Sequence, residues 1–185
     1  NKSGKQTYSI KSDMTKPSFE AKYYTMGTIE GDISGSILTN KKNDVVIYGL
    51  ISDAASGVAS IEIPDASVLY TTASVPGTGF TSEWAKNAAY ESYSEEKSTK
   101  ITGFKATIPY GKITGVEVAA KYSDIAGNSS QSRMFEFNVD TTIPEVEYTE
   151  FVTADSSKSG TYINGKIQLS GTANEIGRAS CRERV

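Results

Sequence analysis

Residues 124–130 read Asp-Ile-Ala-Gly-Asn-Ser-Ser and separate two stretches in which apolar and polar residues alternate. The first stretch covers residues 116–122, and the second covers residues 132–139. Alternation is the pattern of a strand with one buried face, and a Gly-Asn pair is typical of a turn. These residues therefore predict a β-hairpin.

The segment after the hairpin recurs near the start of the chain. Residues 140–147 read Asp-Thr-Thr-Ile-Pro-Glu-Val-Glu and residues 13–20 read Asp-Met-Thr-Lys-Pro-Ser-Phe-Glu, at an offset of 127 positions. Residues 166–171 resemble residues 46–49 at an offset of 122, which an insertion or deletion between residues 20 and 45 would explain. A fixed period of this length indicates tandem repeats. We expect the last strand of a preceding repeat at residues 1–12, a complete domain at 13–140, and the truncated start of a next repeat at 141–174.

Residues 175–185 break this pattern in composition and periodicity. They contain Cys181 and every arginine except Arg133. Reverse-translated, they read after the first base as a common sequencing adapter, so we expect this segment not to be native. The rest of the chain then has neither cysteine nor histidine.

Composition excludes several classes of function. The net charge is −3, and no cluster of basic residues suits nucleic acid. No apolar run approaches the ~18 residues that suggest a membrane-spanning helix. The many Thr, Ser, Asn, Gly and Tyr residues, with an acidic balance, fit a secreted bacterial β-protein.

The strand pattern between residues 13 and 140 predicts an all-β sandwich. Residues 45–51 are a nearly continuous apolar run, as in the middle of a sheet, and residues 58–63 alternate strictly. About seven short strands with turn signals between them favour a two-layer sandwich. We expect a polar connection at residues 27–43, and either a helix or an irregular crossover at residues 80–93.

Two motifs resemble the bacterial immunoglobulin-like repeats of large surface proteins and adhesins. The hallmark is a D-x-A-G-N turn followed by a strand and a V-D-T-T-x-P junction, here residues 122–128 and 139–144. Residues 53–63 look like the second motif of that family. The insertion around residues 80–100 departs from the family pattern.

The resemblance implies an immunoglobulin-like fold and a non-catalytic role as a spacer or adhesive module, at the bacterial cell surface or in a secreted protein. It implies neighbouring repeats of the same chain as partners, and a host or environmental glycan or protein as a further partner. Gly127 and Asn128 are residue types that can adopt the positive φ that a tight hairpin requires. A carbohydrate-binding accessory module of a secreted enzyme is the alternative function.

The resemblance also suggests where a metal ion would bind. Relatives bind calcium near domain junctions through acidic residues, and the matching positions are Asp13, Asp53, Asp124 and Asp140. Carboxylate oxygens suit Ca²⁺. The alternative is that Asp124 caps its turn and Asp140 caps the linker.

The candidate ligand-binding residues are the aromatic residues of the insertion. If exposed, Trp84, Tyr90 and Tyr93 would stack on sugar rings, whereas buried rings would fill the core. Catalysis is not expected, because the chain has no histidine and its Ser and Thr residues lack a nearby base.

Overall fold

The computed structural model describes residues 12–39, 42–113, 117–142, 145–153 and 167–174. The chain divides into two compact units, Asn1–Val139 and Asp140–Val185. Within the described residues, no helix is both long and apolar enough to cross a membrane.

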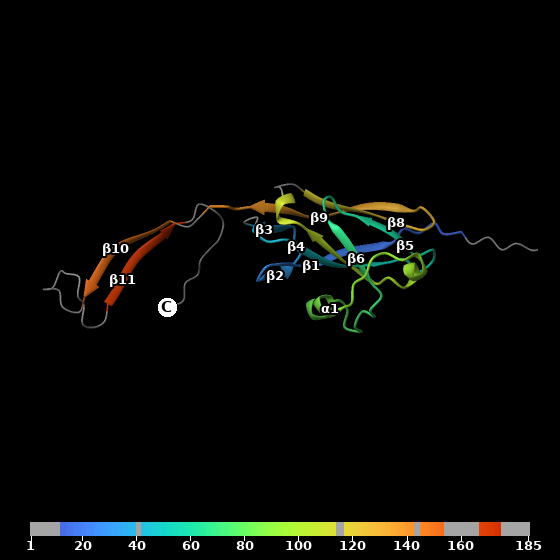
Figure 1. Cartoon of the computed structure of the whole chain (residues 1–185), viewed down its shortest axis with the longest axis horizontal. Coiled ribbons are helices and arrows are strands. Elements are labelled where there is room, and N and C mark those ends of the chain that lie inside the picture. Colours follow the sequence, from blue (N-terminus) through green and yellow to red (C-terminus); the bar gives the residue numbers. More distant parts are fainter. Residues whose placement is uncertain (1–11, 40–41, 114–116, 143–144, 154–166, 175–185) are drawn as a thin grey trace, which may run out of the picture. The chain divides into compact units, whose positions relative to one another are not determined.

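The first unit contains two β-sheets that form separate layers (Figure 1). The five-stranded sheet has the order β2 (Ile29–Asp32), β1 (Ser18–Met26), β4 (Val45–Ser52), β7 (Gly103–Ile108) and β6 (Ser67–Thr71). The four-stranded sheet has the order β3 (Ser36–Thr39), β9 (Ser129–Val139), β8 (Glu117–Asp124) and β5 (Val58–Glu62). Strands β3 and β9 are parallel, and the other paired strands are antiparallel. This architecture confirms the predicted all-β sandwich.

The hydrophobic core lies between the two sheets and takes residues from both. Phe104 of β7 and Phe135 of β9 are fully buried in it. The ring of Phe19 stacks on Phe104 at 5.0 Å and on Tyr122 of β8 at 4.7 Å. Phe19 therefore links the two layers near the start of β1, and each buried aromatic ring removes a large apolar area from water.

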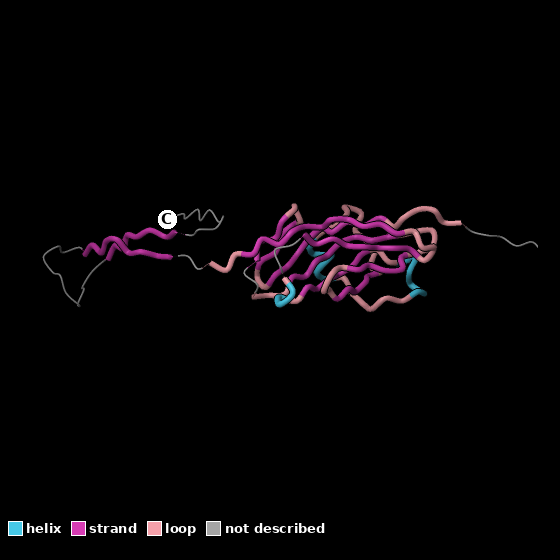
Figure 2. The backbone as a smooth tube through the Cα atoms, turned by 90° about the horizontal axis from the view of Figure 1, so that it is seen from above, coloured by secondary structure: helices cyan, strands magenta, loops and turns pink. Residues whose placement is uncertain are grey.

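Among the described residues, helical structure is limited to short segments (Figure 2). Helix α1 (Ser82–Asn87) lies within the predicted range and begins after Thr81, whose Oγ1 accepts a hydrogen bond from the N–H of Trp84 at 3.1 Å. Two 3-10 helices, η1 (Glu95–Lys100) and η2 (Tyr110–Lys112), follow. Helix α1 covers the outer side of the five-stranded sheet (Figure 1).

One expectation from the sequence was wrong, and the structure adds one detail to the hairpin turn. Residues 27–43 are not a plain connection, because they contain the edge strands β2 and β3. In the hairpin turn Gly127 has a φ of +92°, but Asn128 does not have a positive φ. The turn needs one left-handed residue, and Asn128 contributes a side chain instead.

The second unit contains the hairpin of β10 (Glu145–Thr153) and β11 (Ile167–Asn174). Its pairing repeats that of β1 with β4. Ala21 pairs with Gly49, and Tyr148, 127 positions after Ala21, pairs with Gly171, 122 positions after Gly49. A register irregularity follows both pairs at the same place, between Ala21 and Tyr23 and between Tyr148 and Glu150. The two offsets found in the sequence thus coincide with matching strand register in both units.

Candidate functional site

Three of the four aspartates predicted as calcium ligands come together in the first unit. Carboxylate oxygens of Asp13, Asp53 and Asp124 all lie within 4.8 Å of one another. Asp13 precedes β1, Asp53 directly follows β4, and Asp124 ends β8. We call these three residues the aspartate cluster.

Asp53 organises the loop between β4 and β5. Its Oδ1 accepts hydrogen bonds from the backbone N–H groups of Ala55 at 3.1 Å, Ser56 at 2.9 Å and Gly57 at 2.8 Å. Gly57 has a φ of +91°, and a Cβ there would lie 2.6 Å from Oγ of Ser98, so this position requires glycine. The loop therefore closes tightly around a buried carboxylate.

Asp124 holds the hairpin turn between β8 and β9. Its Oδ1 accepts from the backbone N–H of Asn128 at 2.7 Å, and its Oδ2 accepts from Nδ2 of the same residue at 2.7 Å. The N–H of Ile125 donates to the carbonyl of Gly57 at 3.0 Å, which ties this turn to the Asp53 loop. The capping role expected for Asp124 is therefore present.

Asp13 fastens the segment before β1 to both loops. Its Oδ2 accepts from the N–H and the hydroxyl of Ser56, at 3.1 and 2.6 Å, and its carbonyl accepts from Nδ2 of Asn128 at 3.2 Å. Its Oδ1 accepts from the N–H and hydroxyl of Thr15. The hydrogen bonds from the Ser56 side chain and then from Thr15 favour the charged form and lower the pKa of Asp13 from 3.8 to about 2.

Ser56 and Asn128 are site residues that the sequence analysis did not single out. Both lie inside the motifs used for the resemblance, but there they were interpreted as turn residues. In each motif a polar residue follows the aspartate closely: Ser56 comes three residues after Asp53, and Asn128 comes four residues after Asp124. At this spacing the polar side chain can reach groups of the same loop, and this is the signal that would have found both residues.

Asp140, the fourth predicted ligand, does not join the aspartate cluster. Its Oδ1 accepts a hydrogen bond from the N–H of Thr142 at 2.9 Å, as Oδ1 of Asp13 does from Thr15 at 3.0 Å. The linker cap expected for Asp140 is present. Asp140 repeats the local structure of Asp13 at the start of the second unit.

The aspartate cluster has the chemistry of a site for a hard cation. Three carboxylates at this separation repel one another, and an oxygen-seeking cation such as Ca²⁺ would offset the repulsion. The two oxygens of Asp124 accept one hydrogen bond each and so retain a second lone pair for a metal, whereas Oδ1 of Asp53 already accepts three. The donor set therefore fits calcium, while the same oxygens also serve as turn caps.

The three predicted sugar-binding rings lie in different surroundings. Trp84, on α1, is half-buried and packs edge-to-face on Phe80, with 5.7 Å between ring centroids. Tyr93 packs on Tyr70 at 5.7 Å. They do not form one continuous platform.

Tyr90 packs mainly with protein groups. Its hydroxyl donates to the carbonyl of Ala85 at 2.9 Å, its ring lies 6.1 Å from that of Tyr48, and Nζ of Lys105 lies 5.3 Å from its centroid. Burial, together with the neighbouring Tyr48, raises the pKa of Tyr90. A partly buried hydroxyl that already has an acceptor suits a residue that packs against the protein.

No protein-family model matches this chain, and neither a curated protein nor a solved structure matches it at a significant level.

Proposed function

We propose that this chain is a non-catalytic structural or adhesive module, built from tandem immunoglobulin-like repeats of a bacterial cell-surface or secreted protein. The repeated junction is the observation that carries the proposal. The Asp-x-Thr-x-Pro segment precedes both β1 and β10, its aspartate accepts from the N–H two residues later in both, and the following strand pairs have the same register. Strings of repeats with a fixed period are suited to spacing and display.

The attachment of Asp13 supports a role in bearing load between repeats. Asp13 accepts hydrogen bonds from Ser56 and Asn128, which makes the start of the segment between repeats part of the domain that follows. A proline completes each segment, at Pro17 and Pro144, and restricts the backbone there. Such a link is stiffer than a Gly/Ser-rich linker.

A pulling experiment tests the spacer function. The whole chain is held at its two ends in a single-molecule force instrument. A load-bearing unit resists and then opens in one step, in which residues 13–139 release about 40 nm of chain. Continuous extension without a barrier would contradict the proposal.

We further propose that calcium binds the aspartate cluster and stiffens this junction. Extracellular modules bind calcium with Kd values of ~10⁻⁴–10⁻³ M. About 1 mM Ca²⁺ would then raise the free energy of unfolding by about 0.4–1.4 kcal/mol. The same concentration of Mg²⁺ should have less effect, because Mg²⁺ gives up its waters reluctantly.

A matched pair of variants tests calcium binding. Asp13→Asn removes a carboxylate from the cluster, whereas Asp140→Asn makes the same change at the same type of turn outside it. Denaturant unfolding of the whole chain, followed by the emission of Trp84, is measured with Ca²⁺ and with a chelator. Calcium should stabilise the wild type and Asp140→Asn, but not Asp13→Asn. Without stabilisation of the wild type, the aspartates would be turn caps alone.

A further inference from the structure

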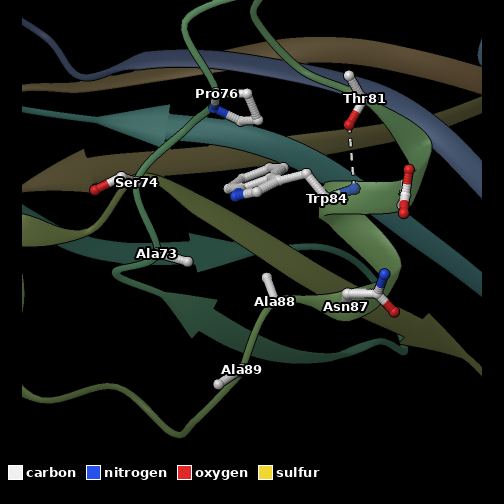
Figure 3. A pocket seen from close by; sticks show the side chains of 9 residues that line it. Ala73, Ser74, Pro76, Thr81, Trp84, Asn87, Ala88 and Ala89 are labelled. Carbon is white, nitrogen blue, oxygen red and sulfur yellow. Dashed lines mark hydrogen bonds between the residues drawn. The ribbon is translucent and has the colours of Figure 1, made fainter.

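A groove on the first unit lies between α1 and the segment after β6, and none of the aspartate-cluster residues lines it. Its volume is about 520 Å³, and Figure 3 shows the side chains that line it. It belongs to the insertion between β6 and β7, which contributes no strand to either sheet. Its lining includes Ser74, Pro76, Thr81, Trp84, Asn87 and Ala88.

Trp84 forms a rigid wall of this groove. Its backbone is fixed by the Thr81 cap, and its ring is held edge-to-face by Phe80. A Cβ on Gly103 would lie 3.2 Å from Cη2 of Trp84, so the absence of a side chain at Gly103 lets the indole settle on β7. Figure 3 shows the ring extending from α1 toward the segment that carries Ala73, Ser74 and Pro76. An aromatic wall already fixed by packing loses little entropy when a ligand binds.

The indole nitrogen supplies a second, independent observation. Nε1 of Trp84 is buried and has no hydrogen-bond acceptor, and it is the one such side-chain nitrogen or oxygen found among the described residues. A buried N–H without a partner costs free energy, and Trp N–H groups in proteins usually have one. A ligand oxygen that displaced the atoms now covering Nε1 would pair this donor.

We propose that this groove binds a neutral saccharide, with a sugar ring against the indole of Trp84. The hydroxyls of Ser74 and Thr81 and the amide of Asn87 both donate and accept, which suits the hydroxyl groups of a sugar. The indole and the apolar side chains of Pro76 and Ala88 suit its C–H face. Glu83 is the one charged side chain of the lining, and it disfavours phosphate and other anions.

The structure also separates this site from the rest of the insertion. Tyr90 and Tyr93 do not line the groove, because each ring packs elsewhere. The site goes beyond the spacer role and does not depend on the aspartate cluster, so failure of calcium binding would leave it untouched.

The single tryptophan makes the test specific, because Trp84 is the chain's only one and its emission reports on this groove. The whole chain is titrated with cellotetraose, maltotetraose and tetra-N-acetylchitotetraose, all of them neutral, up to about 10 mM, a range that covers millimolar Kd values. We expect a saturable change of emission with at least one of them. No saturable change with any of the three would overturn the proposal.

Variants distinguish the groove from other surfaces. Ser74→Ala and Asn87→Ala, both at exposed positions, should weaken binding by about three- to ten-fold. Tyr110→Ala, at an exposed aromatic residue outside the groove, should leave it unchanged. Trp84→Phe keeps an aromatic ring but removes the N–H, and calorimetry should show weaker binding. Equal affinity in Ser74→Ala, Asn87→Ala and the wild type would place the sugar elsewhere and refute the assignment.

Discussion

Alanine at position 49 should destabilise the first unit more than its size suggests. Gly49 lies in β4, between β1 and β7. A Cβ at this position would lie 2.4 Å from the backbone oxygen of Glu20 and 2.5 Å from Cε1 of Phe104, whereas ordinary contacts begin at 3.4 Å. Both neighbours, or the backbone of β4 itself, must therefore shift by about 1 Å.

Neither neighbour can move without cost. The carbonyl of Glu20 belongs to the strand that pairs with β4, and the ring of Phe104 is fully buried. Overpacking of this kind costs about 1–3 kcal/mol, occasionally more, and the lower entropy of the unfolded alanine chain returns about 0.4–1 kcal/mol. With the overpacking cost at the upper end of its range, we expect a net loss of about 2–2.6 kcal/mol, a substantial part of the 5–15 kcal/mol of a typical domain.

Unfolding in urea, monitored by the emission of Trp84, measures this loss of unfolding free energy, because the only tryptophan lies in the first unit. The control is Gly111→Ala. Its Cβ would meet nothing within 4 Å and its φ is not positive, so the change should be neutral or stabilising by up to about 1 kcal/mol. If Gly49→Ala unfolded within about 0.5 kcal/mol of the wild type, the reasoning from close approach would be refuted.

Three further predictions concern charge, the core and the hairpin turn. The folded pKa of Asp13 lies below its ordinary 3.8, so its carboxylate stabilises the fold above pH 4. This contribution is lost as the pH falls toward 2. In urea titrations, the difference in unfolding free energy between the wild type and Asp13→Asn should therefore narrow over that pH range. Phe135→Ala should cost about 3–5 kcal/mol, because the ring is fully buried, and an unfolding midpoint equal to that of the wild type would contradict this. Gly127→Ala should cost about 1–2 kcal/mol because its φ is +92°, whereas Gly77→Ala, with no positive φ and open space, should not.

Much of the sandwich could be predicted from residues 13–139 because its signals are local. The apolar run of β4 and the alternation of β8 and β9 depend on side chains a few positions apart. The edge strands could not be predicted in this way. Strand β3 has four residues and leaves Leu38 half exposed, and it is held by parallel pairing with β9, about 100 positions away.

The sequence by itself determined the repeat, the hairpin turn and the identity of four acidic motif positions, because each is a pattern of residue types at fixed spacing. Tertiary structure decided which aspartates act together. Asp13, Asp53 and Asp124 meet because the start of β1 and the ends of β4 and β8 lie at the same end of the sandwich, whereas Asp140 begins the next unit. It also decided that Trp84 borders a groove while Tyr90 and Tyr93 pack against other tyrosines. Contacts of this kind depend on how strands far apart in the chain pair and pack, and residue spacing does not encode that information.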